Sequence, residues 1–411
     1  MAVDEIKLAQ ELIRFHSLTP PQKSYPALEK SGLTLEQAVA FALKQNEQAQ
    51  DLIASELKKL NFYTQPQKYG DTSALYARYG AQGPHICFNT HTDVVIADEP
   101  TQWKYKPFRG EIADGKLWGR GAVDNKGSTA CAVAACAQLL EQYDVAGSIS
   151  FMISGDEEDT RVRCSKQMIE WMADKKLLPD FIIGTEPTNP TELGQEIKNG
   201  RRGSFYGDVT IKGVSGHAAY PEKANNPVPK LAELFSMLAA LKIDDGMDTF
   251  QPSNLQLLTM DVANPSNNVT ASLATGRFSV RFNPLWDAAK LEAFLREKMD
   301  ETGIKYEMTT KSPSKPFHTP LSPHTDALFK SVQEVTGRTP KFTTNGGTSD
   351  LRFTAPYCLG AEFGLVNETI HKANEHVSLK DMRDLTEIYR RTLEKFFAGH
   401  LTPKTSAPAP V

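Results

Sequence analysis

Residues 85–95, HICFNTHTDVV, form an apolar run that ends in a histidine and an aspartate, and similar runs recur along the first half of the chain. Residues 148–158, SISFMISGDEE, and residues 180–187, DFIIGTEP, also pass from apolar to acidic. Short apolar runs with polar ends are typical of buried strands. Residues 128–143, STACAVAACAQLLEQY, predict a helix between the first two strands, with small side chains suited to close packing. This alternation predicts an α/β domain.

Five residues that can bind a metal ion lie at the ends of apolar runs or in glycine-rich loops. In open α/β sheets, ligands bind beyond the carboxyl ends of the strands, so these side chains are expected to meet there. Two imidazoles and three carboxylates are too few for two separate closed zinc sites. They suffice for two Zn²⁺ ions if one carboxylate bridges and water fills the open positions, which points to a hydrolase; Co²⁺ is a possible substitute. The five residues are His91, Asp124, Glu158, Glu186 and His371.

Taken singly, each motif also fits a purely structural role. His91 with Asp93 fits a surface pair or a capped core histidine, and Asp124 fits a cap of the following helix. Residues 156–158 fit an acidic surface loop. In the functional interpretation, Asp93 orients His91 through its second ring nitrogen, and the two oxygens of Asp124 each take one metal. Glu157 stays free of metal and acts as general base.

A second pattern begins after the glycine-rich, charged segment 197–205. It reads β-α-β-β-α-β, the order of a ferredoxin-like split unit. The expected fold is therefore an α/β catalytic domain with a central mixed sheet flanked by helices, interrupted by an α+β ferredoxin-like lid and dimerisation domain. The predicted elements are 205–214, 227–243, 255–263, 271–283, 288–303 and 304–312. The predicted boundaries are 1–202 and 314–400 for the catalytic domain, 203–313 for the insertion and 401–411 for a disordered tail.

Bulk composition limits the classes of partner and location. The formal net charge of −4 and a pI near 6.2 give no basic field, so nucleic acid is not an expected partner. No apolar run approaches the length of a membrane span. The first 15 residues predict an acidic amphipathic helix rather than a signal peptide, so a cytoplasmic location is expected. The five cysteines form no CxxC pair and are expected to be buried thiols. Residues 47–60 have apolar side chains at helical spacing and predict a helix, whereas residues 19–45 have no predicted role.

The order of the motifs resembles that of a known enzyme family. The chain is similar to the co-catalytic zinc amidohydrolases, which include the aminoacylases, acetylornithine deacetylase and carboxypeptidase G2. The resemblance covers residues 1 to about 397 except 19–45, and within the family it is nearest to the succinyl-diaminopimelate desuccinylases. It rests on HTDVV, WGRGAVDNKG, DEE, GTEPT, KNGRRGS, GVSGHAAYP, NNV, GGTSDLRF and VNETIHKANE.

The resemblance implies a separate duty for each metal-site residue. His91 and Glu186 would bind one zinc, Glu158 and His371 the other, and Asp124 would bridge them. Asp93 would orient His91, and Glu157 would be the base. A further histidine, His217, matches one that reaches across a homodimer, formed through the inserted domain, to stabilise the developing oxyanion.

The resemblance also implies a substrate pocket. Arg201 matches an arginine suited to binding a carboxylate. One position departs from the pattern, since Leu285 stands where the desuccinylases carry an arginine, although Arg281 is near in sequence. The expected substrate class is the small N-acyl amino acids, and the expected member is N-succinyl-LL-2,6-diaminopimelate. A dipeptidase, an N-acetyl amino acid deacetylase and an inactive binding protein are the alternatives. The other pocket positions are Tyr220, Asn267, Asn268, Gly347, Thr348 and Asn367.

Overall fold

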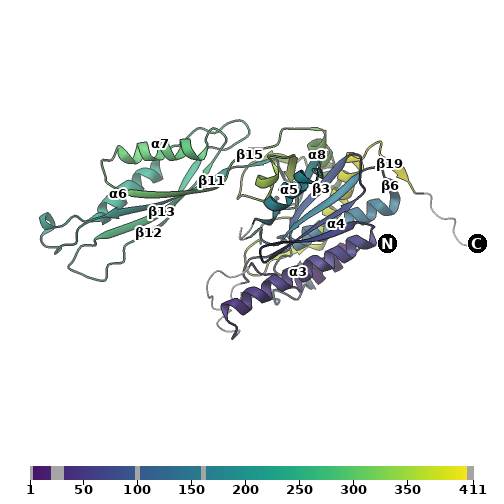
Figure 1. The fold of residues 1–411 in the computed structure, drawn as a ribbon, viewed down its shortest axis with the longest axis horizontal. Coiled ribbons are helices and arrows are strands. Elements are labelled where there is room, and N and C mark those ends of the chain that lie inside the picture. Colours follow the sequence, from purple (N-terminus) through teal and green to yellow (C-terminus); the bar gives the residue numbers. More distant parts are fainter. Residues whose placement is uncertain (1–2, 20–31, 98–101, 159–162, 405–411) are drawn as a thin grey trace, which may run out of the picture. The chain divides into compact units, whose positions relative to one another are not determined.

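A computed structural model describes residues 3–19, 32–97, 102–158 and 163–404 of the chain (Figure 1). Contacts divide these residues into two compact units. The first unit contains the described residues up to 199, together with 319–342 and those from 349 onward. The second unit contains residues 200–318 and 343–348. Gly347 and Thr348 therefore pack with the second unit, although they follow the predicted insertion by more than 30 residues in sequence.

The first unit is built on an eight-stranded mixed sheet with the order β1-β2-β7-β3-β8-β17-β9-β16. The four central strands β7, β3, β8 and β17 run parallel, and β1, β2 and β9 pair antiparallel with their neighbours. This confirms the predicted α/β fold with a mixed central sheet. The strands are β1 Tyr63–Tyr69, β2 Thr72–Tyr79, β3 His85–His91, β7 Ser148–Ser154, β8 Phe181–Gly184, β9 Glu196–Lys198, β16 Lys341–Thr343 and β17 Leu359–Glu362.

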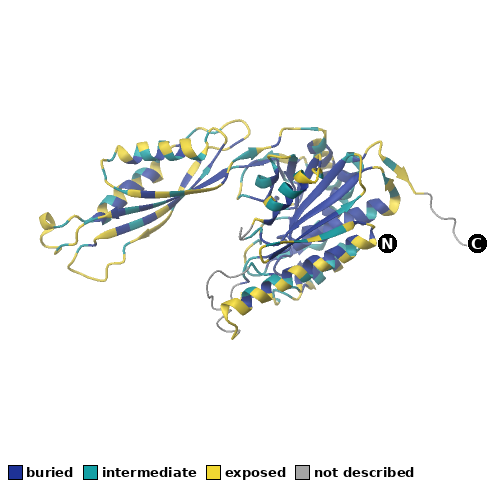
Figure 2. Cartoon of the chain, in the orientation of Figure 1, coloured by how far each residue is buried: buried dark blue, intermediate teal, exposed yellow. Residues whose placement is uncertain are grey.

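Both faces of this sheet are covered, which explains why its central strands are apolar throughout. Every residue of β3 and of β7 is buried (Figure 2). Ile86 and Phe88 of β3 join a core formed with helices α1, α3, α4, α8 and α10. Asn89 points the other way and bonds Ser165 of α5. The helices are α1 Glu5–Ile13, α3 Leu35–Lys59, α4 Lys126–Gln142, α5 Cys164–Asp174, α8 Pro323–Thr336, α9 Leu351–Thr354 and α10 Leu379–Phe396.

The second unit is a four-stranded antiparallel sheet with two helices on one face (Figure 1). Its element order along the chain is β-α-β-β-α-β, as the sequence predicts, and its strand order is β12-β13-β11-β14. Alternate residues of β11 and β13 face α6 and α7 and form a separate core. The elements are β11 Gly203–Lys212, η2 Pro221–Lys223, α6 Pro227–Ala240, β12 Asn254–Asp261, β13 Leu273–Phe282, α7 Ala288–Asp300 and β14 Glu307–Ser314.

Short strands complete each unit. In the first unit, β4 Glu111–Ala113, β5 Lys116–Trp118 and β18 His376–Ser378 form one small sheet. In the second unit, β10 Gly200–Arg201 pairs with β15 Phe317–His318.

Some local predictions need correction. Helix α3 begins at Leu35 rather than near Glu47, because Thr34 forms a capping box with Gln37. Part of the unassigned segment 19–45 is therefore helix, and residues 20–31 lie outside the described residues. The prediction of a disordered tail from residue 401 is wrong for residues 401–403. They form strand β19, Leu401–Pro403, which pairs with β6, Tyr143–Val145. The rest of that tail, from residue 405, also lies outside the described residues.

Two expectations about composition can be compared with the structure. Four of the five cysteines are buried and the fifth is partly buried, and none is disulfide-bonded. Among the described residues, no helix is both long and apolar enough to cross a membrane.

Candidate metal centre

The candidate metal ligands gather at the carboxyl edge of the parallel strands. His91 is the last residue of β3, Glu158 follows β7, and Glu186 follows β8. Because β7, β3 and β8 are adjacent and parallel, their carboxyl ends meet at one edge. The loop after β17, the next parallel strand, supplies His371, and the loop between β5 and α4 supplies Asp124. All five predicted metal ligands lie in the first unit.

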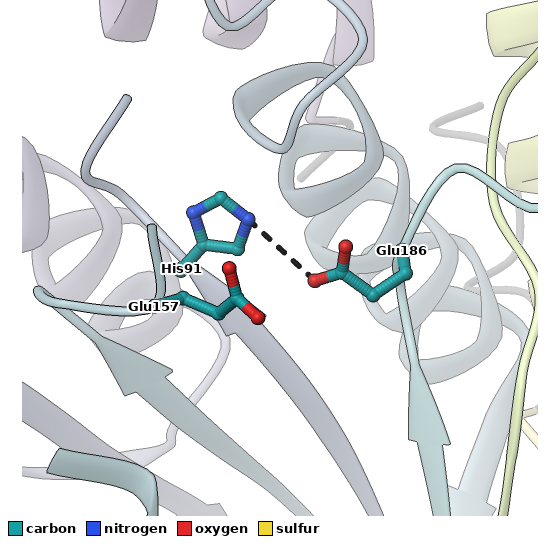
Figure 3. A group of neighbouring side chains, drawn as sticks. All are labelled: His91, Glu157 and Glu186. Carbon is teal, nitrogen blue, oxygen red and sulfur yellow. Dashed lines mark ion pairs between the residues drawn. The ribbon is translucent and has the colours of Figure 1, made fainter. Parts of the chain in front are cut away.

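His91 is almost fully buried and lies among three carboxylates. Its Nε2 is 3.1 Å from Oδ1 of Asp124 and 3.5 Å from Oε1 of Glu186. Its Nδ1 is 2.9 Å from the backbone oxygen of Asp93, which holds the ring so that Nε2 faces the acids. Figure 3 shows the imidazole, the carboxylate of Glu186 and that of Glu157 grouped together. Nε2 is thus the nitrogen available to a metal.

Asp124 connects two clusters through its two oxygens. Oδ1 contacts His91, while Oδ2 is 3.3 Å from Nε2 of His371. The same His371 nitrogen is 3.1 Å from Oε1 of Glu158. Ligand atoms of His91, Asp124 and Glu158 all lie within 4.8 Å of one another. This is the arrangement in which one carboxylate can serve two metal ions, each with its own imidazole.

The charges in this cluster favour a cation. Burial lowers the pKa of His91, but hydrogen bonds with Asp124 and Asp93 outweigh it and raise that pKa well above 6.5. Hydrogen bonds with Asp124 and Glu158 raise the pKa of His371 to about 10. Burial, and then Asp124, raises the pKa of Glu158 to about 7. Without metal, protons on the histidines supply the positive charge. Divalent metal bound to imidazole and carboxylate would supply it instead, so this donor set fits a metal site.

Glu157 lies beside the cluster. One of its carboxylate oxygens is within 4.8 Å of ligand atoms of both His91 and Glu186. Burial, followed by the charges of Glu186 and Asp350, raises the pKa of Glu157 well above 4.5. A carboxyl group with a raised pKa can both accept and return a proton near neutrality.

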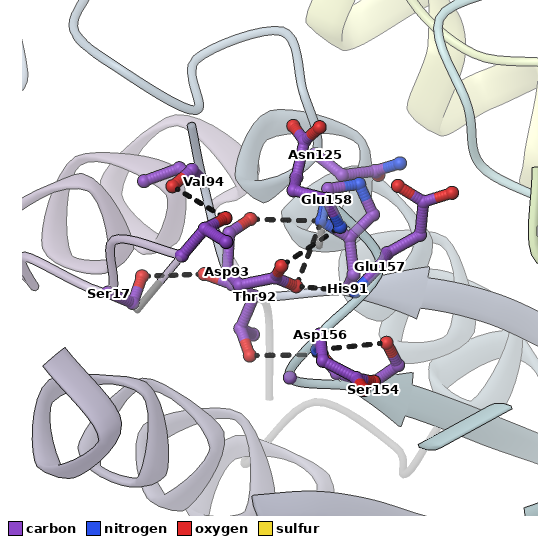
Figure 4. Close-up of polar contacts among 12 residues, drawn as sticks. Ser17, His91, Thr92, Asp93, Val94, Asn125, Ser154, Asp156, Glu157 and Glu158 are labelled. Atoms are coloured by element: carbon purple, nitrogen blue, oxygen red, sulfur yellow. Dashed lines mark hydrogen bonds and ion pairs between the residues drawn. The ribbon is translucent and has the colours of Figure 1, made fainter. Parts of the chain in front are cut away.

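The carboxylate of Asp93 approaches His91 but bonds the acidic loop more closely. Its carboxylate is 3.5 Å from Nδ1 of His91, farther than its own backbone oxygen. Instead, its two oxygens accept the backbone N–H groups of Glu157, at 3.2 Å, and of Glu158, at 3.0 Å (Figure 4). Asp93 therefore positions the acidic loop as well as the histidine, because one residue contacts both through different atoms.

Two residues that support the site were not predicted. Asn125 donates from Nδ2 to Oε1 of Glu186 at 3.2 Å, and its Oδ1 accepts from Thr185 and Thr90. Asn125 is also the N-cap of α4, without a side-chain capping bond, so Asp124 does not cap this helix. The other residue is Glu375, which is buried and bonds the loop that carries Asp124. Both stand inside quoted motifs, but nothing in the sequence shows which distant groups they contact.

Four predicted site residues, from two segments of the chain, lie close together in the second unit. The Nδ1 of His217 accepts the backbone N–H of Ala219, and its ring centroid is 5.5 Å from that of Tyr220. The backbone N–H of Ala218 donates to the backbone oxygen of Asn268 at 2.8 Å. Asn267 is the exposed neighbour of Asn268, and His217 and Tyr220 are exposed as well. The fold thus brings these four residues together on an accessible surface.

Arg201 and the loop that contains Gly347 and Thr348 form a second group in this unit. Nη1 of Arg201 donates to the backbone oxygens of Asn345 and Gly347, each at 3.3 Å. Asn367 belongs to the first unit, where its backbone N–H bonds the oxygen of Asn189. Leu285 is 50 % exposed just after β13, while Arg281 packs against the ring of Tyr206.

The sequence matches a known family and full-length relatives. Residues 87–395 match the profile of peptidase family M20/M25/M40. The chain is 42 % identical to a succinyl-diaminopimelate desuccinylase of Rhodospirillum centenum over 97 % of this chain and 99 % of that protein. It is 41 % identical to a protein of the same name from Xanthobacter autotrophicus, over 95 % and 99 %.

Solved structures of low identity share the fold. An M20 family metallo-carboxypeptidase from Sulfolobus solfataricus aligns with a TM-score of 0.73 at 17 % identity, covering 96 % of this chain and 99 % of that one. The aminopeptidase PepT from Bacillus cereus aligns with the same TM-score at 16 % identity and the same coverage. At such identities the likeness concerns the fold alone.

Proposed function

Because the chain belongs to peptidase family M20/M25/M40, we propose that it is a dizinc amidohydrolase that removes succinate from N-succinyl-LL-2,6-diaminopimelate. The observation that carries the two-metal assignment is the division of Asp124 between His91 and His371. In the proposed site, one zinc would be held by His91 and Glu186 and the other by Glu158 and His371. Co²⁺ would be a working substitute.

The chain's own residues divide the remaining chemistry. When bound, the zinc pair would lower the pKa of a shared water and polarise the amide carbonyl. Glu157 would take the proton of that water and later deliver it to the leaving amine. The raised pKa of the Glu157 carboxyl supports this double role. So does its position, because one of its oxygens lies within 4.8 Å of ligand atoms of His91 and Glu186.

We propose the other groups for substrate binding. Arg201 would bind a substrate carboxylate, since a guanidinium presents a planar pair of donors. The positions that would line the pocket with it are Tyr220, Asn267, Asn268, Gly347, Thr348 and Asn367. In this proposal the product amine leaves with both diaminopimelate carboxylates and the acyl group leaves as succinate.

We further propose a homodimer in which residues 203–313 act as lid and dimerisation domain. His217 would then stabilise the oxyanion in the active site of the partner subunit. Its exposure supports a role in contacts outside its own unit. The edge strand β12 also exposes Leu258 and Met260, at 49 % and 47 %, and an exposed apolar edge favours association.

A substrate panel tests the proposed reaction. Metal-free protein would be loaded with two equivalents of zinc and assayed for release of succinate from N-succinyl-LL-2,6-diaminopimelate. N-acetyl amino acids and dipeptides would be assayed at equal concentration, with Glu157→Gln as matched inactive control. Succinate release with the highest kcat/KM of the panel is expected.

Each other outcome selects an alternative. Leu285 in place of an arginine is the specific observation that favours another acyl group. A higher kcat/KM on acetylated substrates or on dipeptides would make the protein a deacetylase or a dipeptidase. Tight binding of these compounds with no turnover by zinc-loaded protein would indicate an inactive binding protein.

A further inference from the structure

Glu375 is fully buried, and its carboxylate faces the loop that carries Asp124. Its carboxylate accepts four hydrogen bonds. Oε1 accepts the backbone N–H groups of Val123, at 2.9 Å, and Asp124, at 3.1 Å. Oε2 accepts from Nη1 of Arg120, at 2.8 Å, and from the backbone N–H of Gly121, at 3.1 Å. One side chain therefore accepts hydrogen bonds from four of the five residues 120–124, the loop that presents Asp124.

The backbone of Glu375 strengthens the same connection. Its carbonyl oxygen accepts the N–H of Gly119 at 3.0 Å. The backbone of this loop is irregular, since Gly119 and Gly121 have φ values of +155° and +86° that glycine alone adopts easily. Contacts from outside the loop are therefore needed to hold it. A Cβ on Gly121 would lie 2.9 Å from the side chain of Val94 and 3.0 Å from that of Lys126. The contacts with Glu375, together with the bond from the Arg120 N–H to the oxygen of Pro107, hold the loop in place of regular secondary structure.

Glu375 also lies in the same loop as His371, four residues after it. One residue consequently joins the segment that carries the proposed bridging carboxylate to the segment that carries a terminal histidine. Asp124 and His371 are two of the three protein ligands of the second proposed zinc, with Glu158. The first proposed zinc has His91, fixed by strand β3, and Glu186, held by Asn125.

We infer that Glu375 is a positioning residue that sets the spacing between Asp124 and His371 and so determines occupancy of the second metal position. This inference rests on the proposed dizinc site. Glu375 touches neither substrate nor metal and acts through the loop. The second metal depends on it more than the first does, because both the bridge and His371 belong to the segments that Glu375 joins.

The substitution Glu375→Gln tests the inference with little change in shape. The amide keeps one acceptor oxygen but directs an N–H₂ group at donors that need an acceptor. Metal-free protein would be titrated with Zn²⁺ by competition calorimetry. The first equivalent is expected to bind within a few-fold of wild type, and the second about 10- to 100-fold more weakly, the usual loss for a group that orients a ligand.

Two further readouts separate positioning from folding. With two equivalents of Co²⁺, the visible absorption of Glu375→Gln should lose the contribution of the second ion, a signature that a purely structural role would not produce. Glu368→Gln is the matched control, since Glu368 is exposed on the same loop. It should keep both affinities and the wild-type spectrum. Circular dichroism before each titration verifies folding.

A second variant keeps the test decisive if Glu375→Gln does not fold. Glu375→Asp retains the charge beside Arg120 but withdraws the carboxylate by one methylene, and a second-site affinity between those of wild type and Glu375→Gln is expected. Wild-type affinity and spectrum in folded Glu375 variants would overturn the inference while leaving the dizinc proposal intact. Failure of the wild type to bind two metals would instead refute the dizinc proposal itself.

Discussion

The two units of the chain differ in how they hold their proposed functional groups. In the first unit, His91 lies 3.1 Å from Asp124 and His371 lies 3.1 Å from Glu158. Buried neighbours such as Asn125 and Glu375 support this cluster. In the second unit, His217 and Tyr220 are exposed. A buried, cross-bonded cluster has one arrangement and specifies one kind of chemistry. An exposed set of side chains does not by itself specify which substrate is bound.

The largest expected effect comes from the first unit. Glu157→Gln should lower kcat by about 10²- to 10⁴-fold, the usual contribution of general-base catalysis, because the amide cannot accept the proton of the water. Zinc content, measured by atomic emission after gel filtration, should stay at the wild-type value. Near-normal turnover at full zinc occupancy would remove Glu157 from the mechanism.

A somewhat smaller effect is expected for His217 of the second unit. His217→Ala should lower kcat by about 10²- to 10³-fold, as loss of an oxyanion donor does. Verified heterodimers of His217→Ala with Glu157→Gln subunits should then regain about half the wild-type rate, because one of the two sites would have both groups intact. If those heterodimers stay inactive, His217 does not act across a dimer.

Arg201 tests whether the second unit recognises a substrate carboxylate. Arg201→Met should raise KM by about 10- to 150-fold, since a hydrogen bond to a charged group contributes about 1.5–3 kcal/mol. A substrate without the succinyl carboxylate should lose less if Arg201 binds that group. Arg202→Met is the matched control, because Arg202 donates to Asn254, which is not a proposed pocket residue. Equal effects of the two variants would contradict the assignment.

The smallest effect concerns stability at the opposite end of strand β3. Burial, followed by the charge of Arg78, lowers the pKa of His85 from 6.5 to about 4. Between these values the unfolded chain takes up a proton that the folded chain does not, so stability falls as pH falls. From pH 7.5 to 5.5 this loss is about 1.3 kcal/mol for His85.

Urea unfolding of metal-free wild type and His85→Gln at the two pH values measures this contribution. The variant should lose about 1.3 kcal/mol less than wild type over the same interval. Identical losses would show that His85 does not titrate as its burial requires.

Local pattern was enough to predict the central strands and the polar residues at their carboxyl ends, which the structure brings close together. Apolar runs that end in His91 or Glu186 predict a buried strand with a ligand at its end, and the structure places both residues so. The contacts of Asn125, Glu375 and the Asp93 carboxylate could not be predicted, because each joins segments far apart in the chain. The start of α3 was missed because a capping box at Thr34 and Gln37 outweighs a weak apolar pattern.

Zinc-edge anomalous diffraction from zinc-loaded crystals would locate the metal ions of the proposed dizinc site. Two peaks are expected roughly 3.5–4 Å apart, the spacing of two-metal hydrolytic sites, one on either side of Asp124. One peak should lie at His91 and Glu186 and the other at Glu158 and His371. A single peak, or two peaks that do not share Asp124, would refute the dizinc site.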